Sequence, residues 1–457
     1  MLQRKLDYQS LKTVLLYTDA NIRFQISLHM PSIRKIDKIV PLKINHLEFE
    51  DFYTSVNKTH YTFGIYRHYI SGNVPQYHKE DNEMTGNILD IDEFGFDVFP
   101  GSNILLPGDV TFREENVREF RQDTEETERA FRNRLRANEA ALEILTVLKS
   151  TGKTVNEYLQ SLPPIPEDEA GGEEARIRNA LREPVDEIHR SIDADKALLQ
   201  PFDSRRNNTK PLFTRYLQLT ITKENCTQMQ RFEYKKKIFE AIKSLNEILF
   251  GGRVFPIQVK RFIMTTMGIV RLPIGFCVRA NRVESRNNMI THKSFSLLLE
   301  NSESLDFLWM DIHTMEAAAF QTPIVQSTKR LVFPAMATEA LYQIISELPN
   351  LEISVIPTQY AYSPEIYYGL IHAWLSRDRF IGSSFWMGLA DDETGREVLK
   401  MLRTQTTLNS RRTKRCLTIF EDDSVQIEIY YVPLKGSRPY YCDKKCNWML
   451  KIRIVET

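Results

Sequence analysis

The chain has 457 residues, which is long enough for two or three domains that each bury a core. Lys plus Arg and Asp plus Glu both number 60, so there is no excess charge of the kind that attracts nucleic acid or an anionic membrane. No uninterrupted apolar run is long enough to cross a bilayer, and the first residues lack the apolar core of a secretory signal. Five cysteines, mostly far apart, fit a reducing compartment. We therefore expect a cytoplasmic or nuclear protein with no nucleic-acid or membrane partner.

Residues 1–50 are predicted to form a small helical head. Their apolar positions fit two short helices separated by a break at residues 19–21, and Met30-Pro31-Ser32 favours a further helical turn. A segment of this size cannot bury its own apolar face, so it docks either on the rest of the chain or on another protein. The residues predicted to form this face are Leu6, Leu11, Val14, Leu15, Ile22 and Ile26.

The next two segments differ sharply in composition. Residues 51–111 are predicted to be extended, with a strand at Tyr61–Tyr69. Residues 112–200 are a charged helical insert, with a long helix over residues 112–149 that packs along the domain or projects from it. Residues 161–172, rich in Pro, Glu and Gly, predict a linker, and Pro184 interrupts the helical stretch that follows.

Residues 213–264 predict a strand, a helix and a second strand. Phe213–Ile221 alternates as a half-buried strand does, Tyr234–Leu249 has helical periodicity up to Gly251-Gly252, and Ile257–Met264 is extended again. Such a unit predicts a right-handed crossover whose two strands lie parallel.

Strands and helices then alternate to the end of the chain. Strands are predicted at residues 305–312, 329–333, 351–356, 383–389, 415–420, 425–432 and 447–455, and helices at 337–348, 363–374 and 393–403. Helices of about a dozen residues between strands indicate a mostly parallel sheet with crossover helices over residues 211–457. The fold class is therefore α/β, with α+β also possible. No repeat of fixed length supports a regular solenoid.

Candidate chemical motifs are few, and each has a simpler interpretation. Thr151-Gly152-Lys153-Thr154 resembles the end of a phosphate loop, but Val147 stands where that motif needs glycine. Cys442 and Cys446 could supply two zinc ligands, but no nearby pair completes the set of four. Residues 391–393 are acidic at a predicted helix start, where capping accounts for them. We therefore expect no catalytic residue, no metal and no cofactor.

Several stretches together resemble a family of F-box C proteins that is greatly expanded in nematodes. The first runs from Leu6 to about Leu47 and contains Ala20-Asn21-x-Arg23-x2-Ile26-Ser27 and Met30-Pro31-Ser32-Ile33. The further matching stretches are Tyr61–Tyr69, Asp92–Phe96, Pro107–Val110, Arg205–Pro211, Leu219–Thr222, Gly251–Arg253 and Arg271–Gly275. Members of this family carry a divergent F-box followed by a domain of unknown function.

The resemblance implies an F-box-like head that binds the adaptor subunit of a cullin–RING ubiquitin ligase, followed by a region that selects a protein substrate. The six apolar residues of the predicted head face would contact the adaptor. The head departs from the usual pattern, in which Leu-Pro opens the F-box and a Trp lies near its end. Here Asp7 follows Leu6, and no Trp occurs before residue 100.

Three hypotheses about function remain open. The first is a non-catalytic substrate-recognition adaptor of the ligase, whose C-terminal sheet offers the recognition surface. The second is an interaction or structural protein whose degenerate head packs onto the body, so that Leu15→Asp lowers stability. The third is an enzyme with a site in an α/β crevice, which requires a pocket with convergent titratable groups.

Overall fold

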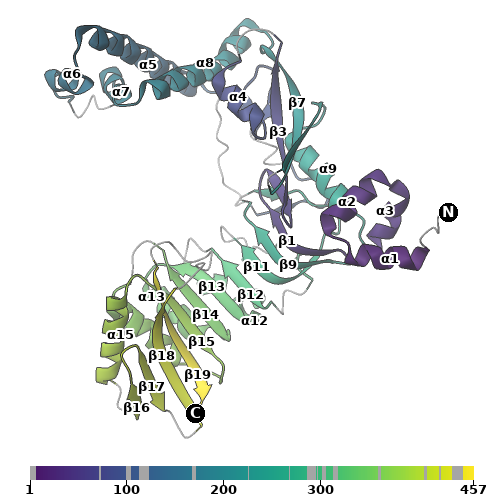
Figure 1. Cartoon of the computed structure of the whole chain (residues 1–457), viewed down its shortest axis with the longest axis vertical. Helices are drawn as coiled ribbons and strands as arrows, with labels where there is room; N and C mark the ends of the chain where they lie inside the picture. The colour runs from purple at the N-terminus through teal and green to yellow at the C-terminus, as the bar shows by residue number, and fades with distance from the viewer. Residues whose placement is uncertain are drawn as a thin grey trace. The chain divides into compact units, whose positions relative to one another are not determined.

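The computed structural model describes most of the chain, and its elements are labelled in Figure 1. The described residues are 7–70, 74–98, 104–112, 123–166, 171–224, 226–266, 268–285, 295, 297–300, 305–311, 317–358, 362–405, 409–420, 424–434 and 446–457. They divide into two compact units. The first unit comprises the described residues of Met1–Lys58, Leu105–Arg113 and Asn246–Thr457, and the second those of Thr59–Ile104 and Glu114–Leu245.

Three helices form the head, as the sequence predicts: α1 (Tyr8–Tyr17), α2 (Ala20–His29) and α3 (Pro31–Lys38). Each begins at a residue suited to a helix start. Asp7 Oδ1 accepts a hydrogen bond from the backbone N–H of Ser10, and Asp19 Oδ1 accepts one from that of Asn21. Pro31 occupies the first position of α3, where a missing N–H costs nothing. The head belongs to the first unit together with the C-terminal sheet.

A long mixed sheet dominates the first unit. Its strands are β1 (Lys43–Phe49), β2 (Tyr53–Val56), β9 (Ile257–Met264), β11 (Val278–Ser285), β12 (Phe307–Met310), β13 (Arg330–Ala335), β14 (Glu352–Pro357), β15 (Ser384–Leu389), β16 (Ser410–Arg412), β17 (Cys416–Phe420), β18 (Val425–Pro433) and β19 (Trp448–Glu456). Their spatial order is β16-β17-β18-β19-β15-β14-β13-β12-β11-β9-β1-β2. In this spatial order, all neighbouring strands between β15 and β1 pair in parallel. The pair β1–β2 at one end and the pairs from β15 through β19, β18 and β17 to β16 at the other end are antiparallel. A short pair, β6 (Val110–Thr111) with β10 (Ile269–Val270), also belongs to this unit.

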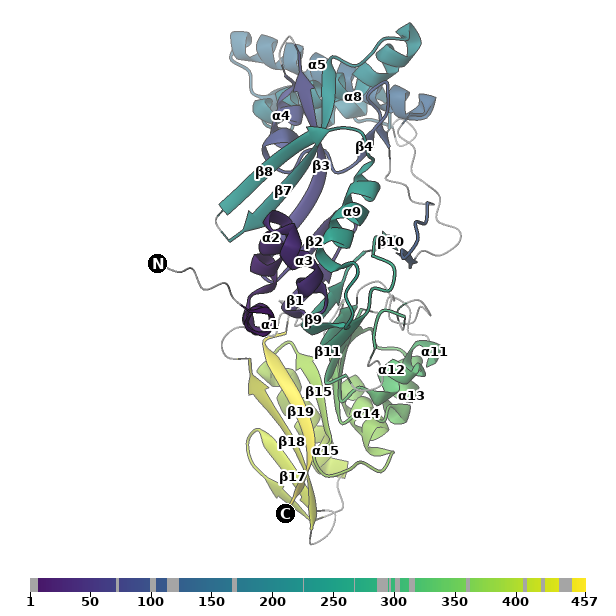
Figure 2. The same cartoon turned by 90° about the vertical axis from the view of Figure 1, so that its right-hand side faces the viewer.

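The helices of this sheet lie on one of its faces (Figure 2). They are α11 (Ala317–Phe320), α12 (Pro323–Ser327), α13 (Glu339–Glu347), α14 (Pro364–Leu375) and α15 (Asp392–Gln405). From β9 to β15 each strand is laid beside the preceding one in a single direction. Because parallel crossovers are right-handed, a sheet wound in one direction receives its helices on one face. Among the described residues, no crossover helix lies on the opposite face of these strands.

Side-chain contacts identify the face that the helices cover. Phe320 of α11 contacts Phe333, Trp374 of α14 stacks on Phe385, and a Cβ at Gly395 of α15 would meet the Tyr431 ring. The strand registers place these three sheet residues on one face. The residues of that face are almost fully buried: Leu331, Phe333, Ile353, Val355, Phe385, Met387, Leu417, Ile429, Tyr431, Leu450 and Ile452.

The second unit contains the antiparallel strands β3 (Thr59–Tyr69), β7 (Phe213–Lys223) and β8 (Cys226–Glu233), and the pair β4 (Asp90–Ile91) with β5 (Asp97–Val98). Its helices are α4 (Gln76–Glu83), α5 (Glu125–Thr151), α6 (Val155–Ser161), α7 (Glu173–Ala180) and α8 (Val185–Asn207). The predicted long helix is α5, and it packs along the unit: Phe131 and Leu135 lie against Leu199 and Phe202. Helix α9 (Ile238–Phe250) spans the boundary between the two units in sequence.

One expectation from the sequence is wrong, and one strand was not predicted. The strands β7 and β9 do not form a parallel crossover, because β7 pairs antiparallel with β3 and β8, whereas β9 pairs in parallel with β1 and β11. The strand β8 was not predicted and occupies residues between β7 and α9. The predicted segment 211–457 is accordingly divided, since the first unit takes its C-terminal part from Asn246 onwards.

Candidate partner-binding surfaces

A buried ion network holds the head together. Arg23 of α2 is 1% exposed, and its Nε donates to Asp37 Oδ1 of α3 at 2.7 Å. The same guanidinium donates to the carbonyls of Asp37, Val40 and Pro41, at the end of α3 and just beyond it. One side chain therefore fixes the crossing of α2 and α3 and the exit of the chain toward β1. Buried guanidinium groups are tolerated only when they are paired in this way.

The same carboxylate joins the head to the body of the first unit. Arg253, which follows α9, donates from its Nη2 to Asp37 Oδ2 at 3.0 Å and is 5% exposed. Lys38 Nζ donates to the carbonyl of Ile248 at 3.1 Å, and the N–H of Val254 donates to the carbonyl of Lys38. Burial, followed by the nearby Arg253, lowers the pKa of Lys38 to about 8. The head is therefore fixed to the C-terminal end of α9.

The residues predicted to form the head face differ in exposure. Leu15 is 1% exposed and belongs to the core, so the prediction that it lies on a binding face is wrong. Leu11 and Ile26 are half-buried, whereas Val14 and Ile22 are 48% and 49% exposed. Leu6 lies outside the described residues.

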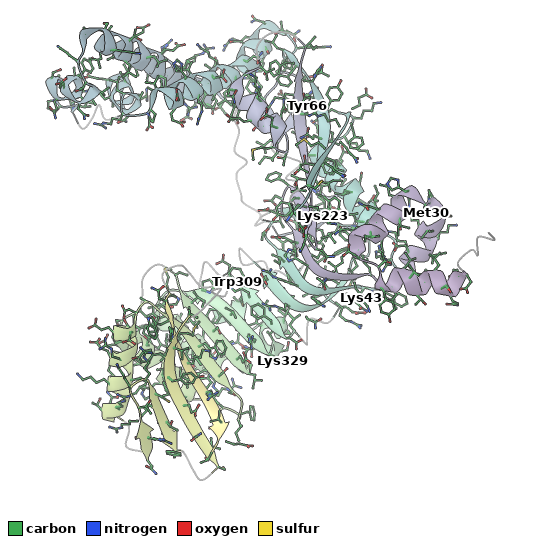
Figure 3. The ribbon with its side chains drawn as sticks, viewed as in Figure 1. Met30, Lys43, Tyr66, Lys223, Trp309 and Lys329 are labelled. Carbon is green, nitrogen blue, oxygen red and sulfur yellow. The ribbon has the colours of Figure 1, made fainter. Side chains whose placement is uncertain are left out.

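Further apolar side chains of the head are exposed. Tyr8 and Tyr17 of α1 are 49% and 80% exposed. Leu28 and Met30, at the end of α2, are also exposed, and Met30 is labelled in Figure 3. We call Val14, Tyr17 and Ile22 the head face; Val14 and Tyr17 are three residues apart and lie on the same side of α1, whereas Tyr8 lies on the opposite side. These side chains retain the apolar surface that binding to a partner through helix faces requires.

A second candidate surface lies on the side of the C-terminal sheet opposite its helices. The registers place Arg330, Glu352, Arg453 and Glu428 in one row and Trp309, Trp386, Lys451 and Tyr430 in the adjacent row. We call these eight residues together with Arg282 of β11 the open face. All nine are exposed or half-buried, whereas Phe307, Val332, Ser354 and Ser384, which lie in the same two rows, are buried. Trp309 of β12 is labelled in Figure 3.

Cations lie over aromatic rings along the open face. Lys451 Nζ is 4.1 Å from the ring centroid of Trp386, and Arg453 Cζ is 5.4 Å from that of Tyr430. Arg282 Cζ is 4.2 Å from the ring centroid of Phe307. Trp, Tyr and Arg dominate the binding energy of protein interfaces, because their rigid apolar bodies carry polar groups. The composition of this face is therefore typical of a protein-binding surface.

Charge on the open face is mixed. Arg330 pairs with Glu352, and Arg453 Nε donates to Glu428 at 2.5 Å. Lys451 and Arg282 add two further cations. The registers place Phe307, Val332, Ile356 and Met449 on this same side of the sheet, where they form a buried apolar cluster with Cys446. Trp309 and Trp386 pack against this cluster. Alternating charges beside an apolar cluster favour orientation-specific binding of a protein.

The chemical motifs of the sequence have structural roles where they are described. Gly152 ends α5 in the left-handed conformation and Thr154 caps α6, so this stretch is a helix-to-helix turn. Asp391 accepts from the backbone N–H of Thr394 at the start of α15, and this hydrogen bond lowers its pKa. Cys446 is buried, and Cys442 lies outside the described residues. Within the part of the chain that the structure describes, no three His, Cys, Asp or Glu side chains gather as a metal site would require.

Several stretches that carry the family resemblance pair with one another inside a unit. Asp109 accepts from Arg271 Nη1 at 2.7 Å, and both side chains are buried. A Cβ at Gly108 would lie 2.6 Å from the backbone nitrogen of Ile274, so only glycine fits there. Arg23 and Arg253 likewise both donate to Asp37, and Asn21 Nδ2 donates to the carbonyl of Val56 in β2. Sequence reasoning could not detect these pairings, because the partners are far apart along the chain.

Comparison with known proteins gives one match. Residues 237–391 match a family model described as "Domain of unknown function (DUF3557)". No curated protein and no solved structure matches the chain. Among the described helices, none is long and apolar enough to span a membrane. The match covers 155 of the 457 residues, from the residue before α9 to the residue before α15. It does not include the head. It confirms the expected domain of unknown function over the parallel strands that carry Trp309, Arg330, Glu352 and Trp386.

Proposed function

We propose that the protein is a non-catalytic protein-interaction module and that it acts as a substrate-recognition adaptor of a cullin–RING ubiquitin ligase. In this proposal the head face binds the adaptor subunit of the ligase. The open face binds the protein substrate. The cytosol and the nucleus are where such a ligase works, and no cofactor is needed.

The buried network around Asp37 carries the proposal. A substrate adaptor must hold its ligase-binding and substrate-binding surfaces at a fixed separation, because ubiquitin is transferred across a defined gap. Arg23 and Arg253 both pair with Asp37, and the head is thereby joined to the unit that contains the open face. A head free to rotate on a linker would not position a substrate.

A binding measurement tests the ligase role. Isothermal titration of the full chain with the purified adaptor subunit is expected to show binding at micromolar concentration or tighter. Val14→Asp and Ile22→Asp place charges on exposed head-face positions, and each is expected to weaken binding by about tenfold or more, since a charge in an apolar interface is left unpaired. Leu297→Asp is the matched control, because Leu297 is 74% exposed and lies on neither surface.

One observation favours a second candidate function. Leu15 is 1% exposed, as expected for a degenerate head that packs onto the body and serves only as structure. In that case the titration with the adaptor subunit shows no heat of binding. The open face would remain the interaction surface of the protein.

A further inference from the structure

The strand β16 ends the long sheet and pairs on one side only, with β17 (Figure 1). The N–H of Thr413 donates to β17, and the C=O of Asn409 accepts from it. In an antiparallel pair, residues that bond across alternate with residues whose N–H and C=O point away. The backbone groups of Ser410 and Arg412 are therefore directed to the free side of β16. No other described residue makes a hydrogen bond to them.

The side chains of β16 and of the turn that follows it are cationic. Arg411, Arg412 and Lys414 are exposed, and none of them forms an ion pair with a carboxylate of the described residues. The nearby Asp392 already pairs with Arg415 at 3.0 Å. Three cations at a free sheet edge therefore lack a counter-ion within the part of the chain that the structure describes.

These cations serve both faces of the edge, because side chains alternate along a strand. The registers place Arg411 in the row of Glu428 and Arg453, which pair with each other. Arg412 lies on the helix side, where its Nη2 donates to the carbonyl of Arg403 in α15 at 3.2 Å. Carboxylates at consecutive positions of an added strand would therefore find a cation on either face.

We propose that the edge of β16 binds an acidic, extended segment of a partner protein, which joins the sheet as a further strand. Ser410 and Arg412 each offer an outward N–H and an outward C=O. A peptide backbone satisfies both, whereas phosphate groups would satisfy the donors alone. Asp or Glu side chains of the segment supply the counter-ions. The proposal goes beyond the ligase role and does not depend on it.

Fluorescence anisotropy of a labelled peptide with the full chain tests the proposal. Acetylated Thr-Val-Glu-Glu-Glu-Val-Thr is expected to show binding that saturates below about 1 mM, and its Gln counterpart is expected to bind at least about tenfold more weakly. The double variant Arg411→Glu with Lys414→Glu is expected to weaken binding of the acidic peptide about tenfold or more. Arg129→Glu with Arg136→Glu, at exposed positions of α5, makes the same change in net charge and is expected to leave binding within about twofold.

Backbone changes separate strand addition from attraction between charges alone. Methylation of every backbone nitrogen of the peptide keeps its carboxylates but removes its donors, and is expected to weaken binding about tenfold or more. Ser410→Pro removes one outward N–H of β16 and leaves the bonds of Thr413 and Asn409 to β17 in place, so about fivefold weaker binding is expected.

Three results would overturn the proposal: equal binding of the Glu and Gln peptides, equal binding of the methylated peptide, or unchanged binding to the double variant at Arg411 and Lys414. Binding of a tetranucleotide, which carries three phosphates, with the same affinity and the same loss in that variant would overturn a protein segment as the partner.

Discussion

Replacing Asp37 with alanine is expected to lower the free energy of unfolding by about 3–5 kcal/mol, because it leaves two buried guanidinium groups without their counter-ion. Arg23 and Arg253 are 1% and 5% exposed, and both donate to this carboxylate. Their other acceptors are backbone carbonyls, which carry no full charge. Denaturant unfolding of the full chain, followed by circular dichroism, measures the change.

The matched control for this substitution is Asp306→Ala. Asp306 also pairs with a cation, Lys329, at 3.0 Å, but its side chain is 53% exposed. An exposed ion pair contributes little, so the expected loss is below about 1 kcal/mol. If Asp37→Ala and Asp306→Ala destabilise the protein equally, the network does not join the head to the body.

The second large effect is expected for Leu15→Asp, at about 3–5 kcal/mol. The substitution removes a side chain that is 1% exposed and buries an unpaired carboxylate in its place. We expect the thermal unfolding midpoint of the full chain to fall by several degrees. Scanning calorimetry measures this directly.

Val14 provides the control for Leu15, since it is the adjacent residue of the same helix and is 48% exposed. Val14→Asp is expected to change the free energy of unfolding by less than about 1 kcal/mol, because the new carboxylate stays in water. Comparable losses for both variants would show that the head buries both sides of α1. The head face would then not be available to a partner.

Much of the C-terminal fold could be predicted from the sequence because its signals are local. The buried residues of β14 and β15 form continuous apolar runs, and Ser363-Pro364-Glu365 starts α14 where the sequence predicts. The hairpin of β17 and β18 follows from two alternating runs separated by a short acidic stretch. The mostly parallel order of the sheet follows from strands that alternate with short helices.

The errors arose where pairing is not local. All eight residues of β8 are exposed, so apolar periodicity gives no signal for this strand. The crossover from β7 to β9 was therefore predicted without the strand that lies between them in the sequence. The strand β11 alternates with charged residues and was not predicted either. The choice of sheet neighbour depends on contacts between residues far apart in the chain, which a local pattern does not contain.

The candidate surfaces were only partly predictable. The apolar residues of the head were found from their spacing, but the burial of Leu15 and the exposure of Val14 depend on packing against the rest of the first unit. A recognition surface on the C-terminal sheet was expected, whereas its residues were not. Trp386 and Lys451 become neighbours only through the antiparallel pairing of β15 with β19, which lie about sixty residues apart in the chain.

The central claim is that the described helices cover only one face of the sheet, so that Trp386 on the opposite face stays accessible, and oxidation of tryptophan by hydroxyl radicals tests it directly. Trp374 of α14 is fully buried beneath the helix-covered face, whereas Trp386 lies half-buried on the open face. Mass spectrometry of the full chain is expected to show that Trp386 is oxidised several times faster than Trp374, because the rate of oxidation rises with the exposure of the side chain. Equal protection of the two side chains would show that Trp386 is covered as well and would contradict the claim.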